Sequence, residues 1–305
     1  GRVSVTTLST YRPIVFWQAH QGAVLRADAW SGYLVTHGRD HSLRVWKMPD
    51  ELGSVALSSS MAKNLPLPTM LHEMGVNALN YCAYDMCIRN EDTPTLDGWL
   101  VIPNTLESGW IDLYHVPSQQ RIIESLGRQA DIRSGTERPA IVMALQICIL
   151  RDILWIVAGY EDGVLQAWTI PVSTMEPTLV WTHKSHTESI MALSMSPTCD
   201  SVLSLGADYN IVRTALHQEA VPHVQRIKRP GHACASVRWD ERVCVLGGWD
   251  ACARVFTWPS LEPLAKLAYH KDSIYALSFV RHDAVHVLHA HLDAVSYTHL
   301  TLPTS

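Results

Sequence analysis

The sequence predicts an all-β fold made of repeated four-stranded sheets, a β-propeller, on three observations. A motif with an aspartate six residues before an aromatic side chain recurs along the chain. Two successive intervals between the aromatic positions, 46 residues from Trp168 to Thr214 and 42 from Thr214 to Phe256, approach the length of one blade, about 40 to 45 residues. Short alternating or β-branched runs lie between Gly, Pro, Asp and Asn, and no long helical periodicity interrupts them.

The motif is clear in three units and weaker in two others. The clear pairs are Asp40 with Trp46, Asp162 with Trp168, and Asp250 with Phe256. In the weaker units Ser108 replaces the aspartate before Tyr114, and Thr214 replaces the aromatic after Asp208. Such units are typical of the WD40 type of propeller blade, whose aspartate lies in the turn between the second and third strands and whose aromatic lies on the third.

Histidines precede several of these aspartates at a similar distance. His20, His186 and His232 come 20, 22 and 18 residues before Asp40, Asp208 and Asp250, and His270 opens one more unit. We expect each histidine to donate a hydrogen bond to its aspartate, and Trp46 to donate to a hydroxyl of the second strand. Thr36 and Ser204, each four residues before its aspartate, are the candidates for that hydroxyl.

A His and an Asp near Ser42 or Ser204 would also suit a hydrolase active site, with the serine as nucleophile. The repetition argues against it, because one active site needs one constellation whereas the pair recurs from unit to unit. No P-loop, nucleophile elbow, zinc-protease or dinucleotide-binding motif is present in the sequence. We therefore predict no catalytic residue and no cofactor, with a site in the propeller channel as the lesser alternative.

The net charge and the spacing of cysteines and histidines limit the kinds of partner and ligand that we expect. A net charge of -5 gives no general attraction to phosphates or anionic lipid, so neither direct nucleic-acid binding nor membrane binding is expected. Seven cysteines without a CxxC spacing are typical of buried thiols in a reducing compartment. Four histidines near the C-terminal end lack the cysteine or carboxylate spacing of a recognisable zinc site, so no metal is predicted; they are His282, His286, His289 and His291.

The predicted domain organisation is one propeller over residues 1–294, with surface insertions at 58–69 and 128–138. Residues 295–305 break the repeating pattern and are expected to be a non-native tail. The chain begins with Gly1 and is expected to be a fragment of a longer protein. Its first residues read as the end of a preceding blade, with Thr6 at the aromatic position.

Several phrases resemble one branch of WD40 proteins, the ASTRA-associated protein 1 family of fungi with its animal counterpart, a G-protein-beta-subunit-like WD protein. They are THGRDHSLRVW at 36–46, VIPNT at 101–105, AGYEDG at 158–163, and GWD at 248–250 with RVF at 254–256, followed by PLA at 263–265. The resemblance implies a seven-bladed propeller, of which about six blades and the end of a preceding one are readable here.

The same resemblance implies a non-catalytic nuclear scaffold, with the cytoplasm as a second compartment. It implies a component of the ASTRA complex, involved in chromatin remodelling and in the maturation of phosphatidylinositol-3-kinase-related kinases, with Tel2, Tti1 and Tti2 as partner subunits. A generic G-protein-beta-like signalling scaffold is the alternative. Arg39, Glu161 and Trp249 are the predicted partner-binding residues, because they precede the blade aspartates in turns that should open onto one rim.

Overall fold

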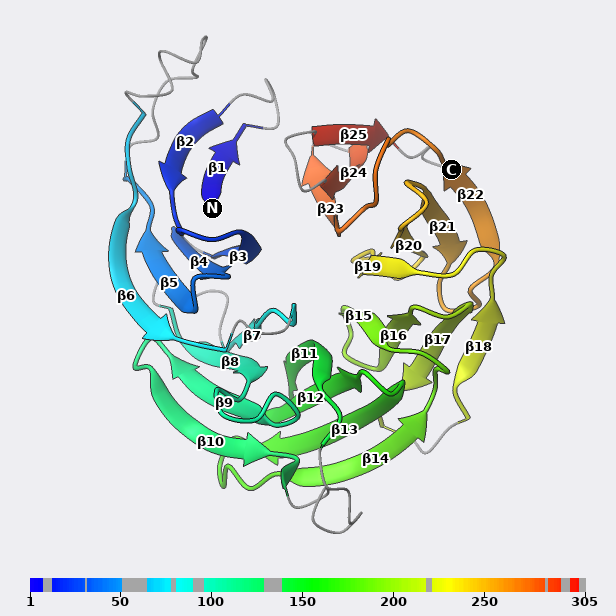
Figure 1. Cartoon of the computed structure of the whole chain (residues 1–305), viewed down its shortest axis with the longest axis horizontal. Helices are drawn as coiled ribbons and strands as arrows, with labels where there is room; N and C mark the ends of the chain where they lie inside the picture. The colour runs from blue at the N-terminus through cyan, green and yellow to red at the C-terminus, as the bar shows by residue number, and fades with distance from the viewer. Residues whose placement is uncertain are drawn as a thin grey trace. The chain divides into compact units, whose positions relative to one another are not determined.

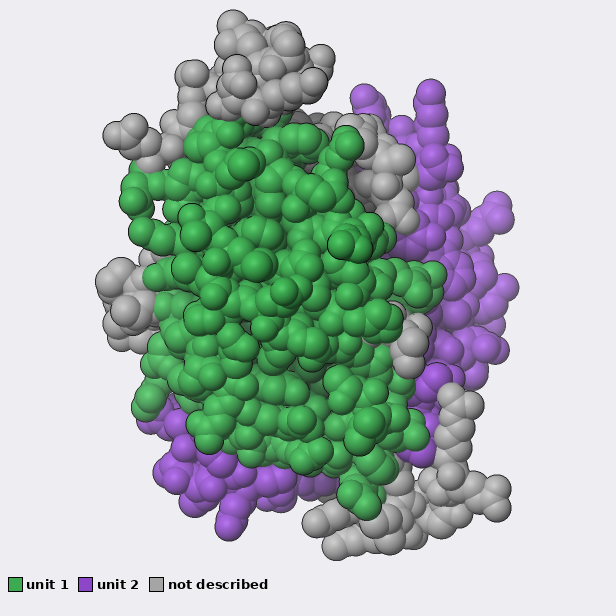
Figure 2. Space-filling model, turned by 60° about the vertical axis from the view of Figure 1, so that its left-hand side comes forward, with its two compact units in different colours: residues 1–136 green, residues 137–305 purple. Residues whose placement is uncertain are grey.

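The structure is a computed structural model that describes residues 1–7, 13–30, 32–50, 65–77, 81–89, 96–128, 139–217, 221–282, 285–291 and 297–301, with side chains as far as residue 279. These residues form 25 strands in seven antiparallel sheets (Figure 1). The chain divides into two compact units, Gly1–Thr136 and Glu137–Ser305, which Figure 2 shows in different colours. Each unit is described separately.

The first unit contains one two-stranded sheet and two four-stranded sheets. Its strands are β1 (Arg2–Thr6), β2 (Pro13–Gln18), β3 (Val24–Trp30), β4 (Tyr33–Gly38), β5 (Ser42–Lys47), β6 (Thr69–Gly75), β7 (Asp85–Ile88), β8 (Gly98–Pro103), β9 (Ile111–Val116) and β10 (Gln120–Leu126). Strands β3 to β6 follow one another in chain order across their sheet, and so do β7 to β10. Every pairing is antiparallel, as expected for strands joined by short turns.

The core of the first unit lies between neighbouring sheets. Trp17 on β2 meets Trp46 on β5 edge to face, with ring centroids 5.6 Å apart. Farther along, Val35 and Leu43 pack with Tyr84 and Leu100. The second strands are buried on both faces, which explains why β8 reads as the nearly continuous apolar run GWLVIP.

The second unit contains three four-stranded sheets and one three-stranded sheet. Its strands are β11 (Val142–Leu150), β12 (Ile153–Tyr160), β13 (Val164–Pro171), β14 (Thr178–Lys184), β15 (Ile190–Met195), β16 (Ser201–Gly206), β17 (Asn210–Ala215), β18 (His223–Arg226), β19 (His232–Val237), β20 (Val243–Gly248), β21 (Ala253–Thr257), β22 (Pro263–Leu267), β23 (Ala276–His282), β24 (Val285–His291) and β25 (Tyr297–Thr301).

Within the second unit the first strands of successive sheets are neighbours. Strand β11 contacts β15, β15 contacts β19, and β19 contacts β23, while β14, β18 and β22 form the outer strands (Figure 1). Apolar side chains from adjacent sheets fill the space between them, as Leu203 and Leu246 do with Phe256. Repetition of one small sheet, each buried against its neighbours, is the packing principle of a propeller.

The strands agree with the repeat pattern predicted from sequence. Asp40, Asp162, Asp208 and Asp250 all lie in or at the turn between the second and third strands of their sheets. Strand β23 begins at Ala276, and Ser273 lies in the loop before it.

Parts of the predicted domain organisation lie outside the described residues. Residues 58–64 of the first expected insertion and residues 129–138 of the second are outside the described part of the chain, and they make up most of each insertion. Leu65, within the first expected insertion, is buried. Strand β25 falls within the expected tail, which breaks the repeating pattern of the sequence, and it pairs with β24. The single domain over 1–294 and the non-native origin of 295–305 stay predictions.

Candidate protein-interaction surface

A buried hydrogen-bond relay connects the strands and the turn of the sheet β3–β6. The Trp46 indole N–H donates to Thr36 Oγ1 at 2.9 Å, and Thr36 Oγ1 lies 2.7 Å from His20 Nε2. His20 Nδ1 lies 2.9 Å from Asp40 Oδ1. Because Thr36 accepts from Trp46, its own proton is available to Nε2, and the tautomer that completes the relay carries its proton on Nδ1 and donates to Asp40.

Asp40 is the acceptor on which this turn depends. It also accepts the Gln21 backbone N–H at 2.9 Å and the Ser42 hydroxyl at 2.8 Å. Burial by itself would raise the pKa of Asp40, but the hydrogen bonds from Gln21, Ser42 and His20 outweigh it and lower the pKa to about 2. Burial also lowers the pKa of His20, so the pair is a neutral histidine bonded to a carboxylate at pH 7.

Removing the hydroxyl in the middle of the relay should destabilise the protein. Thr36→Val keeps the side-chain shape but leaves the Trp46 N–H and His20 Nε2 without a partner, and both residues are buried. We expect a loss of about 1 to 3 kcal/mol in the free energy of unfolding, measured by urea titration. Thr36→Ser, which retains the hydroxyl, is the control; an equal loss in both variants would locate the effect in packing instead of hydrogen bonding.

The sheet β15–β18 contains most of the same relay. His186 Nδ1 lies 3.0 Å from Asp208 Oδ1, and Ser204 Oγ lies 2.9 Å from His186 Nε2. Burial would raise the pKa of Asp208, but hydrogen bonds from His186 and from the Asn210 backbone N–H lower it to about 2. Thr214 stands where an indole would be, and its buried hydroxyl has no partner among the described residues. The structure therefore brings His186, Ser204 and Asp208 together without a fourth member.

The sheet β19–β22 departs from the expected pairing. Both ring nitrogens of His232 are buried without a hydrogen-bond partner in the described part of the chain. Asp250 instead accepts two hydrogen bonds from Arg254, at 2.9 and 2.5 Å, and these lower its pKa to about 2. A guanidinium four residues away satisfies both carboxylate oxygens, so the histidine is not needed as a donor. Burial, with Arg254 nearby, lowers the pKa of His232 to about 4.

The remaining predicted network residues lie apart from any such relay. Asp162 is exposed and accepts the Val164 backbone N–H at 3.0 Å. Trp168 and Phe256 are buried on the third strands β13 and β21. His270 lies in the loop before β23, and its Nε2 has no partner among the described residues.

The sheet β7–β10 uses amides where the sheets β3–β6 and β15–β18 use histidine and aspartate, and the sequence pattern did not reveal them. Asn77 donates to the Asn104 carbonyl at 2.7 Å and to Ser108 Oγ at 3.1 Å. Asn104 in turn donates to Asp112 Oδ1 at 2.9 Å. The sequence signal that could have revealed these amides is Ser108, which replaces the turn aspartate. A serine hydroxyl at that position can accept from a side chain shorter than histidine, such as Asn77.

One edge of each sheet, called the turn edge here, consists of the turns between second and third strands and the loops entering the first strands. All five exposed aromatic side chains among the described residues lie at this edge; they are Tyr81, Tyr209, Trp249, Tyr269 and Tyr275. The relays end at the same edge, at the turn aspartates. The relay of the sheet β15–β18 ends at Asp208, next to Tyr209, and therefore holds fixed the turn that displays this ring.

Each of the three predicted partner-binding residues lies at the turn edge of its own sheet, in a different setting. The Arg39 guanidinium stacks 4.3 Å from the ring centroid of Tyr81 in the first unit. Glu161 is exposed, and its carboxylate accepts the Ile141 backbone N–H at 3.0 Å. Trp249 has 42% of its side chain exposed. Arg39 and Glu161 thus have intramolecular contacts, whereas Trp249 offers a large open apolar surface.

Buried hydroxyls disfavour the hydrolase alternative. Ser42 has 5% of its surface exposed, and Ser204 has none. A nucleophile must reach its substrate, and neither of these oxygens has access to one. Among the described residues, no group of three His, Cys, Asp or Glu side chains is arranged to hold a metal ion.

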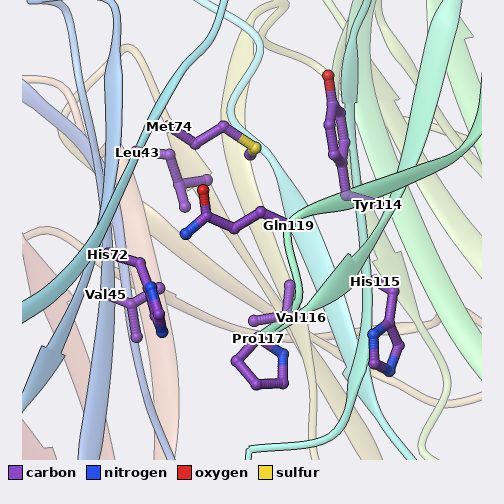
Figure 3. Close-up of a pocket in the computed structure, with 9 residues that line it drawn as sticks. All are labelled: Leu43, Val45, His72, Met74, Tyr114, His115, Val116, Pro117 and Gln119. Carbon is purple, nitrogen blue, oxygen red and sulfur yellow. The ribbon is translucent and has the colours of Figure 1, made fainter.

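A small pocket lies in the first unit between the sheets β3–β6 and β7–β10 (Figure 3). It is lined by Leu43, Val45, His72, Met74, Tyr114, His115, Val116, Pro117 and Gln119. His115 is held by Asp97 at 2.9 Å and by Ser118 at 2.8 Å. The other lining groups are mostly apolar, so the pocket does not combine an acid, a base and a nucleophile.

The described residues also contain no helix long and apolar enough to span a membrane.

Comparison with known proteins places the chain in a family. No family model matches it. ASTRA-associated protein 1 of Verticillium alfalfae is 31% identical over 301 residues, which cover 92% of this chain and 71% of that protein. The chain belongs to the ASTRA-associated protein 1 family. The family member of Penicillium rubens is 30% identical, covering 92% of this chain and 74% of that protein.

Two more distant proteins extend the comparison beyond the fungal ASTRA-associated proteins. The mouse guanine nucleotide-binding protein subunit beta-like protein 1 is 24% identical over 92% of this chain and 79% of that protein. The crystal structure of Saccharomyces cerevisiae Sqt1 superposes with a TM-score of 0.69 at 10% identity, over 97% of this chain and 76% of that chain. This member of the ASTRA-associated protein 1 family therefore has the WD40 β-propeller fold of a scaffold protein, as predicted, while the number of blades stays a prediction.

Proposed function

We propose that this protein is a non-catalytic scaffold subunit of the ASTRA complex, acting in the nucleus, and in the cytoplasm as a second compartment, in chromatin remodelling and in the maturation of phosphatidylinositol-3-kinase-related kinases. The observation that carries the proposal is the 31% identity to an ASTRA-associated protein across 92% of the chain. Its partners are then other protein subunits of ASTRA, or of the Tel2–Tti1–Tti2 assembly.

The geometry of the turn edge supports a holding function. Buried relays such as His20–Asp40 and His186–Asp208 keep the turns in one conformation before a partner arrives. A preorganised surface loses little conformational entropy on binding, so more of the contact energy appears as affinity. The mechanism is multivalent holding of partner proteins without chemical turnover.

Affinity purification followed by mass spectrometry tests this proposal. The tagged chain, expressed in a fungal host, should recover ASTRA subunits. Arg39→Ala and Trp249→Ala should each reduce that recovery several-fold with a nearly unchanged melting temperature, because Arg39 is only half-buried and Trp249 is exposed, and truncating such side chains costs little stability. Arg151→Ala, in the turn between β11 and β12, is the control because it lies at the other end of its sheet. A chain that recovers no ASTRA subunit would contradict the proposal.

A generic G-protein-beta-like signalling scaffold is the second candidate, favoured by the printed name of the mouse relative. It has the same fold and differs only in its partners. Recovery of signalling proteins in place of ASTRA subunits in the same purification would decide for it.

A further inference from the structure

Four loops and turns of the second unit form one continuous surface at its turn edge. The Ile227 N–H donates to the Tyr209 carbonyl at 2.9 Å, and the Trp249 N–H donates to the Gly231 carbonyl at 3.1 Å. The hydroxyl of Ser273 donates to the Trp249 carbonyl at 3.0 Å. Backbone contacts therefore join the β16–β17 turn, the loop after β18, the β20–β21 turn and the loop before β23.

Aromatic and basic side chains are concentrated on this surface. Its aromatic members are Tyr209, Trp249 and Tyr275, with 43%, 42% and 55% of their surfaces exposed. Its basic members are Arg226, Lys228 and Arg229, all exposed. We call these six residues the aromatic–basic surface. Trp, Tyr and Arg are the residue types enriched at binding hot spots.

Trp249 is held in place before any ligand arrives. Its ring lies against Gly231, where an added Cβ would come within 2.1 Å of the indole Cε3. Gly231 also has a φ of +82°, a conformation that favours glycine. Only glycine allows the indole to rest on the backbone here, so the open face of the ring is presented in one fixed orientation.

The charge of the surface is unbalanced. Arg226 lies over the Tyr209 ring at 5.6 Å, and no carboxylate among the described residues forms an ion pair with Arg226, Lys228 or Arg229. Exposed Lys271 adds a fourth positive charge on the far side of Trp249, beside exposed Asp272.

The two turn aspartates offset this charge only in part. Asp250 is paired with the Arg254 guanidinium, whereas Asp208, buried and hydrogen-bonded to His186, keeps one negative charge against the three cations. In a chain with a net charge of -5, this is a local positive region.

We propose that the aromatic–basic surface binds an acidic peptide segment of a partner protein, one that carries apolar side chains between its carboxylates. The proposal deepens the scaffold function proposed above and rests on it. Carboxylates would pair with Arg226, Lys228 and Arg229, and an apolar side chain would cover Trp249. A nucleic acid is disfavoured because affinity for a phosphate backbone depends on how many phosphates Lys and Arg side chains neutralise, and this surface offers only three such cations in a chain of net charge -5.

The test uses the purified full chain and a fluorescein-labelled peptide, EDFEDLEDFEDL, followed by fluorescence anisotropy. The uncharged peptide QNFQNLQNFQNL has the same apolar side chains, and a twelve-residue oligothymidylate serves as the nucleic-acid probe. We expect the acidic peptide to bind about tenfold or more tightly than the uncharged one, and its affinity to fall as salt rises, since exposed charges are screened. Equal binding of the two peptides, tighter binding of oligothymidylate, or no binding would overturn the proposal.

Variants of the aromatic–basic surface test whether the acidic peptide binds there. The double variant Lys228→Glu with Arg229→Glu should weaken binding of the acidic peptide about tenfold, and Trp249→Ala by a similar factor. The charge-matched control is Arg151→Glu with Arg242→Glu, in first-to-second-strand turns of the same unit, and it should change binding less than about twofold. An equal loss in this control would overturn the assignment. If Trp249→Ala fails to fold, the double variant of exposed residues decides alone.

Failure of this proposal is distinguishable from failure of the scaffold function. Recovery of ASTRA subunits from cells together with no peptide binding would leave the scaffold proposal standing and remove this surface as an acidic-peptide site. Peptide binding without recovery of ASTRA subunits would support this surface as an acidic-peptide site and contradict the ASTRA scaffold proposal.

Discussion

Asp40→Ala should lower the free energy of unfolding by about 3 kcal/mol, the largest effect expected of any single turn substitution. The variant removes the acceptor of three donors at once: His20 Nδ1–H, the Gln21 backbone N–H and the Ser42 hydroxyl. His20 and Ser42 are buried, so water cannot replace the lost acceptor without rearrangement. Arg44, 3.6 Å from the carboxylate, also loses a neighbouring charge.

Asp162→Ala is the matched control, because it removes the aspartate from the same position of another sheet. Asp162 is exposed and accepts only the Val164 N–H among the hydrogen bonds described, so its loss should cost less than about 1 kcal/mol. Asp208→Ala should resemble Asp40→Ala, since Asp208 accepts from His186, Thr187 and Asn210. Urea unfolding followed by circular dichroism measures all three. Equal losses for Asp40 and Asp162 would assign the effect to turn formation and not to the buried relay.

The fold could be predicted because a repeated structure repeats its constraints. A sheet of this kind places an acceptor in its tight turn and a large side chain on its third strand, so the spacing between Asp40 and Trp46 returns in the sheets β11–β14 and β19–β22. The predicted relay of His20, Thr36, Asp40 and Trp46 is formed in full for the same reason. Its members lie on the same sheet or in its entry loop, and their separation along the chain is set by strand length.

The relays could not be predicted where another residue competes or substitutes. His232 and Asp250 have nearly the same spacing as His20 and Asp40, yet Arg254 takes the carboxylate. Nothing in the spacing reveals that competition, because it depends on which side chain reaches the turn.

The aromatic–basic surface was hidden for a related reason. Its residues come from four separate segments, and the contact between Gly231 and Trp249 follows from tertiary packing. The sequence pattern singled out Trp249 by its turn position and residue type, without the neighbours that surround it on this surface.

Two buried histidines should make the protein sensitive to mild acid. His37 in the first unit and His232 in the second are each at most 1% exposed. Burial lowers both pKa values from the ordinary 6.5 to about 4; nearby His20 adds to the effect at His37, and nearby Arg254 adds to it at His232. In the unfolded chain both histidines take up protons below about pH 6.5, whereas the folded chain resists protonation until about pH 4.

The sign of the pH dependence follows from this difference in proton uptake. The unfolded state binds more protons between pH 6.5 and pH 4, so the free energy of unfolding is highest above that window and falls as the pH falls through it. At pH 5 each histidine should account for a loss of about 2 kcal/mol relative to pH 8. Asp40 and Asp208, whose folded pKa values are about 2, contribute stability that is lost only below about pH 4. As the pH falls, the protein should therefore lose the stability that depends on the two neutral histidines before it loses the stability contributed by the two aspartates.

Urea unfolding at pH 7.5, 6 and 5 measures this effect, and substitution isolates it. His37→Gln and His232→Gln each remove one titrating group, so whatever their stability at pH 7.5, each should lose about 2 kcal/mol less than the unsubstituted chain on going to pH 5. His223→Gln, at an exposed position on β18, is the control variant and should retain the full pH dependence. If both buried variants lose as much stability as the unsubstituted chain between pH 7.5 and 5, the acid sensitivity arises elsewhere, and the two imidazoles are not buried in their neutral form.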